Sequence, residues 1–170
     1  MEVKIIRSSR RKRTVSARMD EDILIVSAPA LLSEAHLEKI IVDFKFKFQK
    51  KKIKEELDRK ELLAHIAVRI NEKYFANKLK INSIEYVTGQ DSKFGCCNFR
   101  SADIRISHRV GLMPDWVRDY VLIHEMAHLI EPNHSKSFWD IVSRYELAER
   151  ARGYLMAAGD ENIELGFSLW

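Results

Sequence analysis

The sequence predicts an α+β fold, because short segments with strand periodicity lie on either side of a long stretch suited to helices. That stretch, residues 30–88, contains neither glycine nor proline, the strongest helix breakers. The chain has 170 residues, which is the length of one domain with a single hydrophobic core. We therefore predict one domain over residues 1–170, in which residues 1–60 hold the first strands and helix and residues 61–170 hold the remaining core.

Three short strands are predicted near the N-terminus, over residues 3–6, 14–19 and 23–27. The second of them alternates apolar and polar residues, which is the period of a sheet with one buried face. Residues 20–22, Asp-Glu-Asp, supply a turn between the second and third strands. We expect the three strands to form a β-meander, in which neighbours along the chain pair with each other.

Two helices are predicted after these strands. The first begins after Ser33, a suitable N-cap, and continues through a charged run to Lys60. Its apolar residues recur at helical spacing: Leu37, Ile41, Phe44 and Phe48. The phenylalanines of residues 44–48 also alternate with lysines, so a strand there remains the alternative. The second helix is expected to direct five residues inward: Leu62, Leu63, Ile66, Ile70 and Tyr74.

In the second half of the chain, strands are predicted over residues 81–87 and 102–108, separated by a loop that begins at Gly89. We expect the 102–108 strand to lie at a sheet edge, where an extended peptide can pair with it. Pro114 marks the start of the next helix, since proline suits the first helical turn.

The C-terminal part is predicted to support that helix. Ser135 is a suitable N-cap for a further helix, which should place Phe138 and Trp139 beneath the helix that follows Pro114. This further helix is expected to extend toward residues 147–148. An apolar tail is expected to pack on the core: Leu165, Phe167, Leu169 and Trp170.

The helix after Pro114 contains the motif H-E-x-x-H at residues 124–128. Residues four apart lie on one face of a helix, so His124 and His128 direct their imidazoles toward one point, where a metal ion fits. Glu125 follows the first histidine and is placed to take a proton from water that the metal activates. This pattern is typical of a zinc hydrolase.

A third ligand is predicted at His134. Pro132 cannot continue the helical hydrogen bonds, so the helix should end near Glu131 and the chain should turn back toward the metal. Three histidines leave a coordination position open for water, as in catalytic zinc sites. The alternative third ligand is a carboxylate from the following segment, Glu146 or Glu149.

Two further residues are candidates for contact with the ligands or the substrate. Glu131 lies on the same side of the helix as the histidines, where it can orient an imidazole through a hydrogen bond. Tyr120 lies one helical turn before His124 and can reach the substrate. The alternative for Glu131 is capping of the helix end, and the alternative for Tyr120 is packing.

The charge distribution indicates a second class of function. The chain has a net charge of +4, yet residues 1–60 hold 16 Lys and Arg against 10 Asp and Glu, so the rest of the chain is net negative. The basic clusters at residues 10–13 and 50–52 favour contact with phosphates or an acidic partner. A basic nucleic-acid-binding or partner-binding protein with a structural or vestigial metal is therefore the alternative function.

The sequence also limits the location of the protein. No apolar run approaches the ~20 residues that span a bilayer, and the N-terminus lacks the apolar core of a secretion signal. The two cysteines, Cys96 and Cys97, are adjacent, which fits neither a disulfide framework nor a C-x-x-C metal site. We expect a cytoplasmic protein with no membrane contact and with reduced thiols.

Five segments together resemble the YgjP-like metallopeptidases: residues 93–97, 103–107, 119–121, 124–129 and 131–139. These are zincin-type proteins described as predicted metal-dependent hydrolases, and they are distantly similar to SprT-like proteases. The resemblance implies a zincin-like fold in which His124, His128 and His134 bind the metal and Glu125 is the general base. The family's loop usually reads Arg-Trp-Gly-Ser-Cys, whereas here Phe94 replaces the tryptophan and Cys96 the serine.

These observations lead to one main hypothesis. We predict a zinc-dependent metallopeptidase or amide hydrolase that binds one Zn²⁺ per chain, uses Glu125 as its catalytic residue and acts on a peptide or protein substrate. Combined with the basic N-terminal region, the SprT-like resemblance implies a further alternative, a protease that acts on nucleic-acid-bound proteins.

Overall fold

The computed structural model describes residues 1–158 and contains helices together with two small sheets, so the predicted α+β class is confirmed. The chain forms two compact units, Met1–Lys52 (unit 1) and Ile53–Trp170 (unit 2). The boundary falls inside the first helix, α1 (Glu34–Lys60). The organisation as one domain, with parts 1–60 and 61–170, stays a prediction, and the predicted apolar tail lies outside the described residues.

Unit 1 begins with a three-stranded sheet of β1 (Glu2–Ser8), β2 (Ser16–Asp20) and β3 (Ile23–Pro29). The strand order is β1-β3-β2, with β1 parallel and β2 antiparallel to β3, so the predicted β-meander is wrong. The most apolar strand takes the centre, because a central strand is covered by neighbours on both sides. Leu24, Val26 and Ala28 of β3 are accordingly fully buried.

The helix α1 packs on this sheet with the spacing that the sequence predicted. Leu37 joins the buried residues of β3, and Ile41, Phe44 and Phe48 pack against them from the same helix. A strand over residues 44–48 is therefore excluded. Arg7 of β1 fixes the start of α1, because its guanidinium donates to the Leu32 carbonyl over 2.7 Å and pairs with Glu34.

Unit 2 holds the second sheet, formed by β4 (Ser83–Val87), β5 (Gly95–Asn98) and β6 (Asp103–Ser107). The order is β4-β6-β5, with β4 parallel and β5 antiparallel to β6. The expectation that the 102–108 strand forms an edge is wrong, because β6 lies at the centre and buries Ile104 and Ile106 completely. The edge beside it belongs to β5, a four-residue strand that the sequence analysis did not predict.

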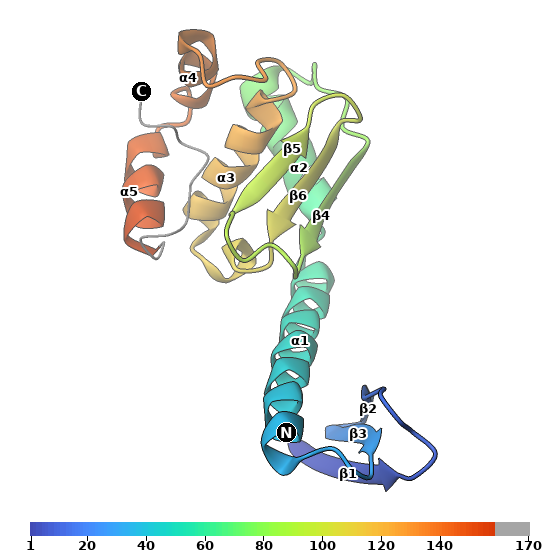
Figure 1. Ribbon diagram of the computed structural model, residues 1–170. Helices are drawn as coiled ribbons and strands as arrows, with labels where there is room; N and C mark the ends of the chain where they lie inside the picture. The colour runs from blue at the N-terminus through green and yellow to red at the C-terminus, as the bar shows by residue number, and fades with distance from the viewer. Residues whose placement is uncertain (159–170) are drawn as a thin grey trace. The chain divides into compact units, whose positions relative to one another are not determined.

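The helices of unit 2 are α2 (Leu63–Phe75), α3 (Asp115–Ala127), α4 (Lys136–Val142) and α5 (Ala148–Ala158), and a short 3₁₀ turn, η1 (Val110–Leu112), precedes α3. In Figure 1, α3 runs beside β5 and β6, and α5 lies on its other side. The sequence analysis expected one helix from Ser135 toward residues 147–148, whereas α4 ends at Val142 and a separate helix, α5, begins at Ala148. Leu62 precedes α2 and is about half exposed, so its predicted inward direction is wrong.

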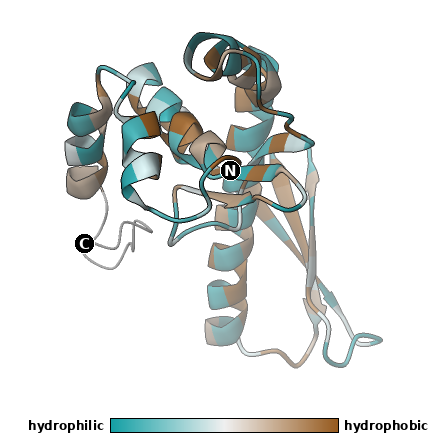
Figure 2. Ribbon diagram, turned by 90° about the horizontal axis from the view of Figure 1, so that it is seen from above, coloured by the Kyte–Doolittle hydropathy of each residue, from teal (hydrophilic) through white to brown (hydrophobic). Residues whose placement is uncertain are grey.

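The core of unit 2 is built around α3, where nine of the thirteen residues are buried. Its apolar side chains meet Ile66 and Ile70 of α2, the central strand β6, and Leu155 of α5. Figure 2 shows hydrophobic and hydrophilic residues alternating along the helical ribbons, as expected for helices with one buried face. Because α3 is enclosed by the other elements, its side chains have fixed surroundings.

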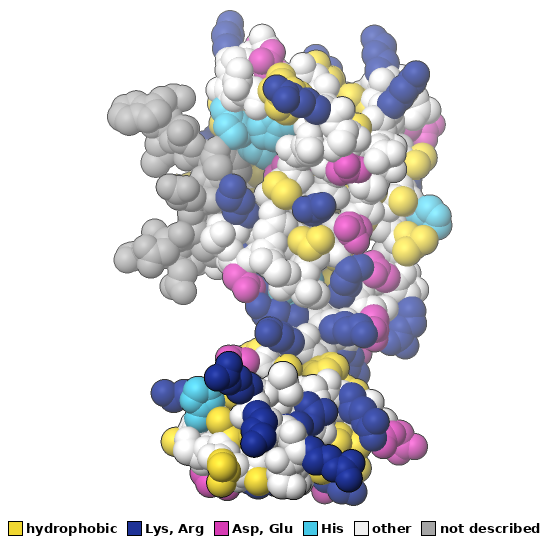
Figure 3. Space-filling model, turned by 45° about the vertical axis from the view of Figure 1, so that its right-hand side comes forward, with side chains coloured by type: hydrophobic (Ala, Val, Ile, Leu, Met, Phe, Trp, Pro, Cys, Tyr) yellow, Lys and Arg dark blue, Asp and Glu magenta, His cyan; other side chains and the backbone are white. Residues whose placement is uncertain are grey.

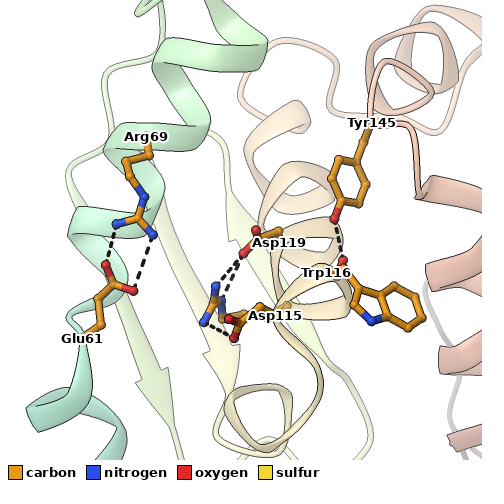
Figure 4. A network of polar contacts seen from close by, with 7 residues as sticks. Glu61, Arg69, Asp115, Trp116, Asp119 and Tyr145 are labelled. Carbon is orange, nitrogen blue, oxygen red and sulfur yellow. Dashed lines mark hydrogen bonds and ion pairs between the residues drawn. The ribbon is translucent and has the colours of Figure 1, made fainter.

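Polar contacts at the start of α3 and on α2 are drawn in Figure 4. Arg118 pairs with Asp115 over 2.9 Å and with Asp119 over 2.8 Å, and Tyr145 donates its hydroxyl to the Trp116 carbonyl over 2.9 Å. On α2, Arg69 pairs with Glu61, which follows α1. The contact of Tyr145 with Trp116 thus joins the start of α3, the helix that carries the histidine motif near its other end, to the segment that follows α4.

Candidate metal centre

The regular part of α3 ends at Ala127, four residues before the predicted end near Glu131. Hydrogen bonds of a closing turn continue beyond it, because Leu129 N–H donates to Met126 O over 3.1 Å and Glu131 N–H donates to Ala127 O over 2.9 Å. The tighter turn starts the change of direction before Pro132, and the proline then prevents the helix from resuming.

This turn brings His134 to His124 of α3 and to His128, the residue that directly follows α3. The ring nitrogens Nε2 of His124 and His134 are 3.1 Å apart, and one ring nitrogen from each of the three histidines lies within 4.8 Å of the others. Among residues 1–158, this is the one group of three or more histidine, cysteine or acidic side chains that converges in this way. Figure 3 shows histidine side chains gathered on the surface of unit 2.

Two neighbouring groups fix the orientation of these rings. The Nδ1 of His128 lies 3.3 Å from the backbone carbonyl of Glu131, so its proton is held there and Nε2 is directed to the other histidines. The contact thus involves the backbone of Glu131, whereas the sequence analysis expected its side chain. Phe138 of α4 is fully buried beneath the histidines and stacks on His128, with 4.6 Å between ring centroids.

The position of Phe138 follows from the start of α4. Ser135 is the N-cap, as predicted, and its hydroxyl accepts a hydrogen bond from Phe138 N–H over 3.3 Å. Trp139, the next residue, stacks on His134 with 5.6 Å between ring centroids. The predicted support of the histidines by this helix is therefore confirmed.

The electrostatic surroundings favour neutral imidazoles. Burial and the neighbouring His128 and His134 lower the pKa of His124 well below its usual value. Burial also lowers the pKa of His128 and His134. Neutral imidazole is the form that binds a metal ion, because the ligand nitrogen must offer its lone pair.

Glu125 lies beside the histidines and is almost completely buried. Burial raises the pKa of Glu125 to about 8, and the positive charge of Lys93 acts in the opposite direction. On its β5 side, the carboxylate rests directly against Gly95, where a side chain would leave it no space. The sequence analysis missed this role of Gly95, for which a glycine in a short strand is the available signal.

The histidines and Glu125 open onto a cleft of about 330 Å³ in unit 2. The loop before β5 and β5 itself line one part of the cleft, and α3, the turn after it and α5 line the rest. Its lining consists of Lys93, Phe94, Gly95, Cys96, Cys97, Phe99, Tyr120, Val121, His124, Glu125, His128, Pro132, His134 and Leu155. The histidines and Glu125 therefore border the same cleft as part of the edge strand β5.

The other candidate residues divide into two groups. Tyr120 is fully buried, lines the cleft and has its pKa raised by burial. Glu146 and Glu149, the alternative third ligands, do not belong to the convergent group, and Glu149 pairs with Arg152 over 2.9 Å. The geometry thus favours His134 as the third nitrogen.

These residues fit a metal ion by two structural criteria. Zinc–nitrogen bonds of about 2.0–2.1 Å put two ligand nitrogens of a tetrahedral ion about 3.3 Å apart, close to the 3.1 Å between His124 and His134. Two neutral ring nitrogens at this distance can also share at most one proton, which leaves only one of their lone pairs as an acceptor. A cation between the nitrogens interacts favourably with the lone pairs of both. A carboxylate next to the nitrogens completes the set that a metal hydrolase needs.

Comparisons with known proteins bear on this arrangement. In the solved crystal structure of the metallopeptidase zymogen of Pyrococcus abyssi abylysin, the fold is similar, with a TM-score of 0.50 and 20% sequence identity over 60% of this chain and 99% of that chain. No curated protein matches the chain in sequence. None of the helices within residues 1–158 is both long and apolar enough to cross a membrane.

The family comparison covers most of the candidate site. The model of a family described as YgjP-like, metallopeptidase domain, matches residues 45–147, which is more than half of the chain and includes the three histidines and Glu125. This match agrees with the resemblance of the sequence motifs and with the fold. The chain belongs to the YgjP-like metallopeptidase domain family.

Proposed function

We propose that this protein is a zinc-dependent peptidase that hydrolyses amide bonds in peptides or proteins. The observation that carries the proposal is the convergence of three imidazoles beside the buried carboxylate of Glu125 on one cleft. Membership of a metallopeptidase family supports it. Zinc is proposed as the metal because three neutral imidazoles with an open position are a typical ligand set for catalytic zinc.

The proposed mechanism assigns one chemical step to Glu125. When bound, zinc would polarise the substrate carbonyl and lower the pKa of a water molecule toward neutrality. Glu125 takes the proton of the attacking water and delivers it to the leaving nitrogen. The charge of a bound zinc ion would lower the pKa of this carboxylate from about 8, so that Glu125 would be ionised and could act as the base at neutral pH.

The ligand side chains are held for this task by their neighbours. His128 keeps its Nδ1 proton on the Glu131 carbonyl and offers Nε2, while Phe138 blocks movement of the ring. Glu131 thus acts through its backbone. The orientation of the imidazoles is set before metal binding, which reduces the entropic cost of forming the site.

The substrate is proposed to bind as an extended chain along β5. One side of β5 pairs with β6, and its other side has no strand partner among residues 1–158. Because Gly95, Cys96 and Cys97 also line the cleft, a peptide paired with this edge passes beside the histidines. The comparisons give no support to nucleic-acid binding by the lysines and arginines of unit 1, which Figure 3 shows in dark blue, so peptide hydrolysis alone is proposed.

Two measurements test the proposal. The purified protein should contain about one zinc ion per chain, and His134→Ala should lose most of it. Glu125→Gln should keep the zinc and lose on the order of 100-fold or more in peptide turnover, because the amide cannot accept the proton. Glu149→Gln, which alters an exposed carboxylate paired with Arg152, is the matched control and should retain activity. Equal turnover by Glu125→Gln and the control would remove Glu125 from the mechanism.

A further inference from the structure

Tyr120 occupies an unusual place in the cleft. It lies four residues before His124 on α3, so both side chains share one face of the helix, and their ring centroids are 6.2 Å apart. Tyr120 lines the same cleft as His124 and Glu125, although it is fully buried.

The hydroxyl of Tyr120 has no hydrogen-bond partner among residues 1–158. A buried tyrosine hydroxyl normally finds one, because an unsatisfied polar atom away from water costs free energy. Tyr145 follows this rule in the same unit, since its hydroxyl donates to the Trp116 carbonyl over 2.9 Å. Phenylalanine would fill the position of Tyr120 without this cost, so packing alone does not explain the hydroxyl.

The residues around Tyr120 divide the cleft into an outer and an inner part. Lys93, Phe99 and Pro132 line it and are exposed, which places them at its mouth. Other lining residues are buried and apolar, and they form the inner part: Phe94, Val121 and Leu155. Tyr120 thus brings a buried hydroxyl without a partner to a cleft that is lined in part by apolar side chains, an arrangement in which one hydrogen bond can select a ligand.

We propose that Tyr120 determines substrate specificity by donating a hydrogen bond to a neutral polar group at the end of a long substrate side chain, such as that of tyrosine or glutamine, held in the inner cleft. The apolar walls contact the stem of that side chain. A neutral group is required because the carboxylate of Glu125 lines the same cleft and repels an acidic one. This inference rests on the proposed peptidase function and defines the substrate class of that site.

The test compares Tyr120→Phe with the wild-type protein on a degenerate peptide mixture, with the cleavage products identified by mass spectrometry. At one substrate position, the wild type should prefer tyrosine over phenylalanine and glutamine over methionine by about five-fold to ten-fold, the effect of one hydrogen bond. Tyr120→Phe should lose this preference, with other positions and the zinc content unchanged. Tyr145→Phe is the matched control, because it removes a tyrosine hydroxyl that bonds to the Trp116 carbonyl and Tyr145 does not line the cleft.

A second measurement needs no turnover. Two peptide mixtures are prepared that differ only at the selective position, where one has tyrosine and the other phenylalanine. If no selective position has been identified, the exchange is made at each position in turn. Both mixtures are titrated into two zinc-loaded proteins, the Glu125→Gln variant and the Glu125→Gln variant that also carries Tyr120→Phe. The tyrosine mixture should bind more tightly only when Tyr120 is present. Identical specificity profiles, or an equal loss for all peptides, would overturn the specificity role. Absence of zinc-dependent cleavage by the wild type would instead contradict the proposed function, and the binding comparison would still decide the role of Tyr120.

Discussion

Gly95 of β5 lies so close to Glu125 of α3 that a β-carbon built at the glycine would be 2.5 Å from the carboxylate oxygen Oε1. The added β-carbon would also lie within 3 Å of Cγ and Cδ of Glu125, so the whole side chain of Glu125 would have to move. The edge strand and the proposed general base therefore share a space that only glycine leaves free. The position of the base depends on a residue thirty positions earlier in the sequence.

The first prediction concerns this contact. Gly95→Ala should displace the Glu125 carboxylate and lower kcat/KM by about 10-fold to 100-fold, since small misplacement of a catalytic group is costly. Zinc content should stay unchanged, because the three atoms nearest the new methyl group all belong to Glu125 and none belongs to a histidine. Gly89→Ala is the control, as a β-carbon there meets nothing within 4 Å. If both variants hydrolyse peptides equally well, the contact does not position the base.

The second prediction concerns Phe138. Phe138→Ala should lower the free energy of unfolding by about 3–5 kcal/mol, the usual effect of removing a fully buried phenylalanine, and should weaken zinc binding by about 10-fold to 100-fold. The loss of affinity is expected because the ring stacks on His128 and contacts His124 and His134. Urea unfolding and competition with a zinc chelator measure the two effects.

Controls separate these two effects of Phe138. Phe138→Leu keeps most of the volume and should recover most of the stability but less of the zinc affinity. Phe46→Ala changes an exposed phenylalanine of α1 and should affect neither quantity by more than a small amount. Unchanged zinc affinity in Phe138→Ala would show that the turn alone holds the imidazoles.

The sequence contained enough information to predict the grouping of the histidines. His124 and His128 are four residues apart on a helix, and Pro132 implied a change of direction before His134. Both signals are local, because they depend on backbone geometry over a few residues. The structure brings the three rings together accordingly, while their role as metal ligands stays a proposal.

Other features depend on contacts between distant segments and could not be predicted in this way. The four residues of β5 have no clear alternation, so this strand is defined by its pairing with β6. The order β1-β3-β2 likewise follows from which strand is buried most. The tight turn between β2 and β3 predicts only that β2 is one neighbour of β3, and no local signal identifies β1 as the other. The contact of Gly95 with Glu125 joins two elements whose packing no local pattern reveals.

The third prediction concerns pH and Asp103. Hydrogen bonds from Ser101, Ser83 and Asn82 lower the pKa of Asp103 from 3.8 to about 2. Because the folded-state pKa is below the unfolded value, the stabilisation is complete above about pH 4 and is lost as the pH falls toward 2. Asp103→Asn should therefore be less stable than the wild type at pH 5–7, and the difference should shrink below pH 4. Urea midpoints measured across this range check it, and a constant difference at all pH values would contradict it.

The last prediction concerns Asn71, whose side chain joins α2 to the segment that follows it. Its Nδ2 donates to Leu79 O over 2.9 Å, and its Oδ1 accepts from Leu79 N–H over 3.2 Å. Asn71→Ala should lower the free energy of unfolding by about 1–3 kcal/mol, because both groups of the Leu79 backbone lose their partner. Asn71→Asp keeps the shape and the acceptor but places an oxygen against the Leu79 carbonyl, so it should destabilise the protein at least as much. A well-tolerated Asn71→Asp in urea unfolding at pH 7 would mean that Asn71 acts by packing and that the paired hydrogen bonds contribute little.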